Sequence, residues 1–266
     1  MIRTRLQIFR WLLLIGLFCS SAAQAATPAI AIIIDDLGYR YAEGKRAVAL
    51  PGPIACAIIP NTPHSGIMAQ AAHAFGKEVL LHLPMQPLDP ERPVGDDGIA
   101  LDTSRIGVAA ALRKGIASVP HVIGVNNHMG SLITRHPGHM TWLMQDLHDR
   151  ELFFIDSVTT ESSVALKMAR EQGVPSARRD VFIDREDATP QEILEQLERL
   201  YKQAHQNGHA LGIAHPYPAT MTVLERELPR LSEHGVRLVS ISDFVQLANQ
   251  RTVAGVELAL TEKHTH

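Results

Sequence analysis

Acidic and imidazole side chains follow five apolar runs of the sequence. They are Asp35 and Asp36 after residues 32–34, His82 after 79–81, His128 beyond 124–125, Asp156 after 153–155 and His215 after 211–214. Carboxylates and imidazoles are ligands for a divalent metal such as zinc. A site with three protein ligands leaves a position for water, as hydrolytic metal sites do. These residue types therefore predict metal-assisted hydrolysis if the fold brings them together.

The apolar runs indicate strands of a parallel sheet. Most of them are continuously apolar, which is typical of strands buried on both faces, and amphipathic helical stretches lie between them. This alternation predicts one α/β domain, and we expect its sheet to close into a barrel. The expected strands cover residues 30–34, 54–59, 78–83, 122–125, 152–155, 181–183, 210–214 and 236–241.

The clearest helical stretch follows Thr189. Thr189, Pro190 and Glu192 match an N-cap, a proline at the first helical position and a capping-box glutamate. An apolar face continues to Ala204, and Gly208 is typical of a helix end. Similar faces lie at 108–116, 140–147 and 223–231. The loop expected at 86–103 is rich in Pro, Gly and Asp and should border the site.

Parallel strands end on one face of a sheet or barrel, so five strands would deliver the six side chains to one place. Neighbouring residues of an extended strand point to opposite faces. The chain turns after the first strand, however, so one of Asp35 and Asp36 can bind metal while the other faces the attacking water.

Each of these residues also has a purely structural interpretation. The two aspartates at 35–36 suit a turn or a helix cap, and His82 or His128 alone suits a hydrogen-bonded core or loop histidine. His215 precedes a proline and can simply end a strand, and Asp156 can cap a helix that begins near Glu161. The shared position of all six after an apolar run favours a common site.

The composition excludes several other kinds of protein. The chain has 266 residues, 45% hydrophobic and 20% charged, with a mean hydropathy of zero, which is typical of a globular protein and not of a disordered one. Aromatic residues make up 5% and accompany no basic run, so we expect no nucleic-acid partner. The sequence has no glycine-rich phosphate loop or nucleophile-elbow serine. Cys56 lies inside an apolar run, which predicts a buried, unreactive thiol.

Residues 1–25 predict a secretory signal peptide. Three arginines precede an apolar run at 11–19, and Ala-Gln-Ala follows at 23–25. The run is short for a membrane span, and a retained anchor is the alternative. We expect a periplasmic protein that begins at Ala26 and has no stable membrane insertion. Loss of three arginines with the signal peptide changes the formal charge from −3 to −6. Residues 251–266 are expected to form a polar, disordered tail.

The segments around the six residues resemble the motifs of the divergent polysaccharide deacetylases, a branch of the carbohydrate esterase family four fold. The resemblance covers nearly all of the chain after residue 25. Residues 33–38 are similar to the opening motif, 213–215 are similar to the last, and 82–86 occupy the place of the histidine metal motif. Residues 126–131 and 154–157 match the divergent branch in sequence and order. The resemblance implies roles for four residues: Asp35 as general base, Asp36 and His82 as metal ligands, and His215 as general acid.

Two motif positions differ from the ordinary family. The ordinary family has a second metal-binding histidine four residues after the first, and Gln86 stands there. We therefore assign the third ligand to His128, on the geometry of the expected strand ends. The ordinary family also has an arginine that orients the base. Asparagines at 126–127 occupy that region, and one of the arginines at 178–179 is a possible substitute.

Together these observations predict a single-domain, distorted (β/α) barrel of the polysaccharide deacetylase type over residues 26–250. We expect an exported deacetylase that uses a divalent metal, with zinc as the first choice, on an acetylated glycan, and Asp156 to orient His215. The first alternative is a non-catalytic glycan-binding or envelope-assembly protein that keeps the metal site as structure. The second is metal-dependent hydrolysis of another ester or amide.

Overall fold

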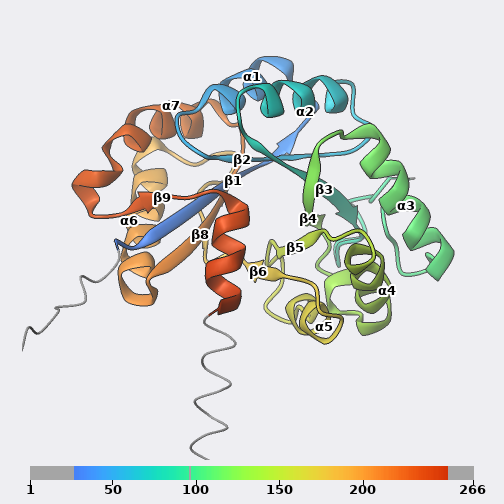
Figure 1. Cartoon of the computed structure of the whole chain (residues 1–266). Coiled ribbons are helices and arrows are strands. Elements are labelled where there is room, and N and C mark those ends of the chain that lie inside the picture. The colour runs from blue at the N-terminus through green and yellow to red at the C-terminus, as the bar shows by residue number, and fades with distance from the viewer. Residues whose placement is uncertain (1–26, 96, 251–266) are drawn as a thin grey trace, which may run out of the picture.

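The computed structural model describes residues 27–95 and 97–250, in which nine parallel strands curl into a half-barrel with helices around its outer face (Figure 1). The strand order is β6-β5-β4-β3-β2-β1-β8-β7, and β9 pairs with β1. The strands are β1 (Ala29–Leu37), β2 (Ala55–Ile58), β3 (Glu78–Met85), β4 (Val122–Met129), β5 (Phe153–Asp156), β6 (Ser176–Arg178), β7 (Val181–Phe182), β8 (His209–Ala214) and β9 (Arg237–Leu238). The predicted α/β class is therefore confirmed.

Seven α-helices and two 3₁₀ helices lie wholly within the described residues. The α-helices are α1 (Tyr41–Ala49), α2 (Ser65–Ala74), α3 (Arg105–Ser118), α4 (Pro137–His148), α5 (Ala165–Glu171), α6 (Pro190–Asn207) and α7 (Pro218–Glu227). The 3₁₀ helices are η1 (Ile133–Arg135) and η2 (Leu228–His234). A further helix occupies residues 241–250. Within the described residues, no helix is both long and apolar enough to span a membrane.

The strands are apolar throughout because both faces of the sheet are covered. Along β1, Ile30, Ile32 and Ile34 pack into the core beneath the outer helices. Ala31 and Ile33 point the other way, into a second core that includes Phe244 and neighbouring residues of the helix at 241–250. This helix stands against the concave face of the sheet (Figure 1). Such burial on two faces is what a continuously apolar parallel strand requires.

The predicted distorted (β/α) barrel is confirmed as a curled half-barrel, although the sheet does not close as expected. Its two edges are β6 and β7, which are three and two residues long. The chain crosses between these edges at once: the Arg179 amide donates to the Asp156 carbonyl of β5, and the Asp180 amide donates to the Leu211 carbonyl of β8. Strands this short leave the opening unpaired, and the helix at 241–250 covers the interior instead. The sequence prediction also missed β6.

Several local predictions can be compared directly with the fold. The capping box at Thr189 and Glu192 is present, and Gly208 ends α6 with a φ of 77°. The expected strand at 236–241 is wrong beyond Leu238, because Ile241 belongs to the last described helix. Cys56 is buried, and burial raises the pKa of its thiol to about 12, so it is not a reactive nucleophile at neutral pH. The signal-peptide and tail predictions lie outside the described residues.

Candidate metal centre and active site

A cleft of about 470 Å³ lies at the carboxyl ends of the strands. Five of the six side chains predicted from the sequence line it: Asp35, Asp36, His82, His128 and His215. Pro87, Asp89 and Arg92 of the loop after β3 form part of its rim, as the sequence predicts for this segment. The sheet thus brings together residues that lie up to 180 positions apart in the chain.

The end of β1 directs two consecutive aspartates into this cleft. Asp36 has a φ of 59°, in the left-handed region that a non-glycine residue rarely adopts. The register with β2 also shifts between Ile34 and Leu37. An extended strand would send Asp35 and Asp36 to opposite faces, and the turn at Asp36 removes that constraint. Backbone strain of this kind is concentrated at functional sites.

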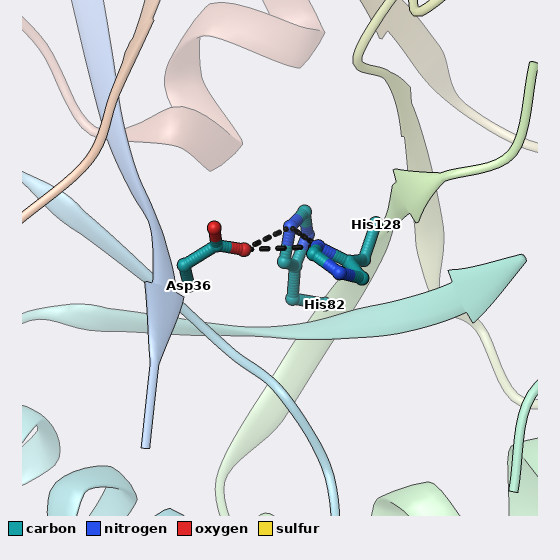
Figure 2. A group of neighbouring side chains, drawn as sticks. All are labelled: Asp36, His82 and His128. Atoms are coloured by element: carbon teal, nitrogen blue, oxygen red, sulfur yellow. Dashed lines mark hydrogen bonds and ion pairs between the residues drawn. The ribbon is translucent and has the colours of Figure 1, made fainter. Parts of the chain in front are cut away.

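Asp36, His82 and His128 point toward one another from β1, β3 and β4 (Figure 2). Oδ1 of Asp36 lies 3.2 Å from Nε2 of His82 and 2.9 Å from Nδ1 of His128, and the two ring nitrogens are 3.2 Å apart. Ligands held 2.0–2.1 Å from a tetrahedral zinc ion are roughly 3.3 Å from one another. The spacing of these three atoms therefore fits a shared cation.

The surroundings of Asp36 Oδ1 agree with this fit. The atom is buried and accepts no hydrogen bond of good geometry from the described residues. Burial favours the neutral acid, but the imidazoles of His128 and His82 outweigh it and hold the pKa of Asp36 well below its usual range. Asp36 is therefore a carboxylate at neutral pH, with one oxygen free to bind a cation between the two rings.

Asn126 sets the tautomer of His82. The Asn126 amide donates from Nδ2 to Asp35 Oδ1 at 2.8 Å, so its Oδ1 is the acceptor that faces Nδ1 of His82 at 2.9 Å. The proton of a neutral His82 then sits on Nδ1, and the lone pair of Nε2 faces Asp36. A hydrogen bond to the second nitrogen is the usual support of a metal-binding histidine. The Asn126 side chain thus contacts both the expected base, Asp35, and an expected metal ligand, His82.

Asp35 is the most buried acid of the cleft, with 2% of its surface exposed. Burial raises its pKa, and this effect exceeds the opposing influence of His82 and His215 and of the Asn126 hydrogen bond. His82 has the reverse balance: burial lowers its pKa, but Asp35 and Asp36 outweigh burial and raise it. A buried carboxylate with a raised pKa is a stronger base than an exposed one.

The residue that orients His215 is Asp184. The prediction that Asp156 has this role is wrong. Nδ1 of His215 lies 2.8 Å from Oδ1 of Asp184, and the His215 backbone amide donates to Oδ2. Asp156 instead accepts from the amide of Val158 and the hydroxyl of Ser163. The reason is strand order: Asp184 follows β7, the neighbour of β8, whereas Asp156 ends β5.

The contact with Asp184 leaves Nε2 of His215 facing the cleft, 3.9 Å from Oδ2 of Asp36. Burial lowers the pKa of His215, but the hydrogen bond and charge of Asp184, with Asp35 and Asp36, outweigh burial and raise it to about 9. The imidazole is therefore able to hold a proton at neutral pH.

The alternative interpretation of Asp156 as the cap of a helix that begins near Glu161 is also wrong, because α5 begins at Ala165.

The two positions that differ from the ordinary family have local explanations. Gln86 uses Oε1 to accept from the backbone amide of Leu101, so it holds the loop after β3 and lies outside the ligand cluster. Asn126, and not an arginine, donates to Asp35. Arg179 donates to the carbonyls of Ser157 and Val158 and so supports the wall of the cleft. Arg178 is exposed and pairs with Glu161.

Comparison with known proteins agrees with the fold and the strand-end motifs. The chain is 38% identical to the uncharacterized protein YibQ of Escherichia coli K12 over 197 residues, or 74% of this chain and 61% of that protein. It is 38% identical to an uncharacterized protein of Haemophilus influenzae over 214 residues, 80% of this chain and 75% of that protein. The crystal structure of an uncharacterized protein of Agrobacterium tumefaciens C58 has a TM-score of 0.79 at 23% identity, over 84% and 91% of the two chains. The model of the divergent polysaccharide deacetylases matches residues 32–245, and the chain belongs to that family.

Proposed function

We propose that this protein is a metal-dependent hydrolase that removes acetyl groups from a polysaccharide or related glycan of the cell envelope. The observation that carries the proposal is the convergence of the Asp36 carboxylate and the His82 and His128 imidazoles in one cleft with the Asp35 carboxylate and the His215 imidazole. A bound cation such as zinc would supply Lewis-acid polarisation of water and of the acetyl carbonyl.

Asp35 and His215 supply the proton transfers in this proposal. Asp35 is held by the Asn126 amide and faces the cleft, so it is placed to take a proton from the attacking water. Asp184 accepts a hydrogen bond from Nδ1–H of His215, so the second proton that the imidazolium carries lies on Nε2, the nitrogen that faces the cleft. His215 is placed to protonate the departing amine or alkoxide. General acid–base catalysis of this kind contributes about 10²- to 10⁴-fold to a rate.

The assay that tests this proposal measures acetate release from acetylated oligosaccharides by the zinc-loaded protein. We expect release by the wild type and a loss of about 10²- to 10⁴-fold in Asp35→Asn and in His215→Ala, with metal content nearly unchanged. A protein that binds zinc and oligosaccharide but releases no acetate would be the non-catalytic glycan-binding protein of the alternative. Release from a simple aryl ester but not from any acetylated sugar would favour another ester or amide substrate.

We further infer that the protein acts in the periplasm. The inference rests on the basic start, apolar run and Ala-Gln-Ala sequence within residues 1–25. N-terminal sequencing of the protein recovered from the cell envelope should give Ala26 as the first residue. Recovery of the protein with Met1 still in place would contradict export with cleavage and support a retained anchor.

A further inference from the structure

Two aromatic rings contact the imidazole of His215, and the mechanism proposed above does not use them. The ring of Tyr217 lies nearly parallel to the imidazole, with an interplanar angle of 26° and ring centres 5.4 Å apart. The ring of Phe182 meets the same imidazole edge-on, at 67° and 5.2 Å. All three side chains line the cleft. Offset-stacked and edge-to-face arrangements at such distances are the two that aromatic rings prefer.

Packing in the core does not account for Phe182 and Tyr217, which we call the aromatic pair. Phe182 is 44% exposed, although it belongs to β7. Tyr217 is half-buried, and its hydroxyl makes no hydrogen bond to any other described residue. The contact that the two rings have in common is the one with His215.

The backbone holds Tyr217 close to His215. Pro216 and Pro218 flank it, and proline restricts both its own φ and the conformation of the residue before it. The Tyr217 amide donates to the carbonyl of His215 at 2.8 Å, and the Tyr217 carbonyl accepts from the amide of Met221 in α7 at 2.9 Å. The position of the tyrosine ring is therefore tied to the start of α7.

Phe182 is held from the other side of the opening in the sheet. The guanidinium of Arg179 lies 5.0 Å from the centre of the Phe182 ring. Arg179 itself donates to the carbonyls of Ser157 and Val158, which follow β5, at 2.7 and 2.8 Å. A series of contacts thus runs from the end of β5 through Arg179 and Phe182 to His215.

The hydrogen bond with Asp184 alone does not fix the plane of the His215 ring. Nδ1 lies 2.8 Å from Oδ1 of Asp184. One hydrogen bond restrains Nδ1, but the ring can still tilt about the line that joins Nδ1 to Oδ1, and a tilt displaces Nε2. Tyr217 against one face and Phe182 against the ring oppose that tilt. The position of Nε2 matters because a misplacement of about 1 Å can cost roughly 10²-fold in rate.

We infer that Phe182 and Tyr217 are positioning residues for His215, whose rings keep Nε2 directed into the cleft. The expected effect on rate rests on the proposed function. The restraint on the imidazole is a property of the protein alone and is measured without substrate or metal. Because the rings act and the tyrosine hydroxyl does not, phenylalanine should replace Tyr217 and leucine should not.

Four single variants test the rate. Phe182→Leu and Tyr217→Leu each remove a ring, whereas Phe182→Tyr and Tyr217→Phe keep it. In each leucine variant, kcat for acetate release should fall by about tenfold with KM within about threefold, since an oriented acid acts in the transition state and not in binding. The ring-keeping variants should retain wild-type kcat. The control is Phe75→Leu, which removes an exposed ring at the end of α2, outside the cleft, and should also retain it.

Proton NMR of the metal-free proteins measures the restraint itself. The signal to follow is the Nδ1 proton that His215 donates to Asp184. Its exchange with water should be faster by about three- to tenfold in the leucine variants, because the loss of one aromatic contact changes an equilibrium by about this factor. Exchange should be unchanged in Tyr217→Phe, Phe182→Tyr and Phe75→Leu. If the wild type releases no acetate, the activity is rejected and the exchange rates still test the restraint.

The inference is overturned if proton exchange in either leucine variant equals that of the wild type, or if exchange is faster but kcat of an active protein does not fall. A rise of KM in place of a fall in kcat would assign the rings to substrate binding and also overturn it. A loss in Tyr217→Phe as large as that in Tyr217→Leu would assign the effect to the hydroxyl. An equal loss in Phe75→Leu would show that the effect is not specific to the aromatic pair.

Discussion

Oδ1 of Asn126 lies 2.9 Å from Nδ1 of His82, and this contact decides which nitrogen of His82 faces Asp36. The same amide donates to Asp35. One buried side chain therefore connects the group placed to accept a proton with a group placed to bind metal. One substitution of Asn126 can remove the contact with Asp35 alone, and another can remove both contacts.

Asn126→Asp keeps an oxygen toward His82 but replaces the donor to Asp35 by a second carboxylate. We expect zinc affinity to stay within about threefold. Turnover should fall by roughly 10²-fold, because the neighbouring charge raises the pKa of Asp35 further and keeps it protonated, and a protonated carboxyl cannot accept a proton from water. Asn126→Ala removes both contacts and should also weaken zinc binding by about 10- to 100-fold. Zinc titration and acetate release on both variants check this. Equal zinc affinity in Asn126→Ala and the wild type would show that the contact with His82 does not support the ligand.

The proposed ligand set of Asp36, His82 and His128 predicts how much zinc each single-residue variant retains. Asp36→Ala, His82→Ala and His128→Ala should each lose bound zinc, because a site with two ligands holds the ion far more weakly. Gln86→Ala is the control, since its side chain bonds to the backbone of Leu101 and should leave zinc bound. Metal analysis with circular dichroism separates loss of zinc from loss of fold. A His128→Ala protein with full zinc would remove His128 from the ligand set.

Substitutions of Asp184 and Asp156 should have different effects on the pKa of His215. In metal-free Asp184→Asn the pKa of His215 should fall from about 9 toward its ordinary value of 6.5, because the hydrogen bond and the charge that raise it are gone. Turnover of the zinc-loaded variant should fall by about 10²-fold or more. Asp156→Asn should leave the pKa of His215 raised. NMR titration of the imidazole measures both, and a drop in Asp156→Asn alone would return the orienting role to Asp156.

The sequence was sufficient to predict the α/β class, the strand-end location of the site and five of the residues that line the cleft. Asp184 follows the apolar residues 181–183, so the rule that identified the other side chains also applies to it. The strand at 181–183 was expected, but Asp156 also follows an apolar run, so the pattern offers two aspartates as partners for His215. Strand order then decided which aspartate meets His215, and the sequence pattern does not specify strand order.

The unclosed sheet and the last helix could not be predicted for a related reason. Residues 236–241 are apolar enough for a strand, and a short apolar run does not distinguish a strand from a buried helix segment. Tertiary packing decides the outcome, because Ile241 and Phe244 fill the concave face that a closed barrel would have filled with side chains of its own strands. The capping box at Thr189 was predictable because it depends on local sequence alone.

Glu192 gives a prediction for stability against pH. Hydrogen bonds from the backbone and hydroxyl of Thr189, then the ion pair with Arg185, lower its pKa from 4.5 to about 2. A group whose pKa is lower in the folded state stabilises the fold above pH 4.5, and this contribution is lost as the pH falls toward about 2. Glu192→Gln can still cap the helix but does not titrate. The melting temperature of the variant should therefore lie below that of the wild type at neutral pH, and the gap should narrow steadily below pH 4.5. Thermal unfolding of both proteins across this range measures the gap, and a gap that stays constant would show that the charge of Glu192 does not contribute to stability.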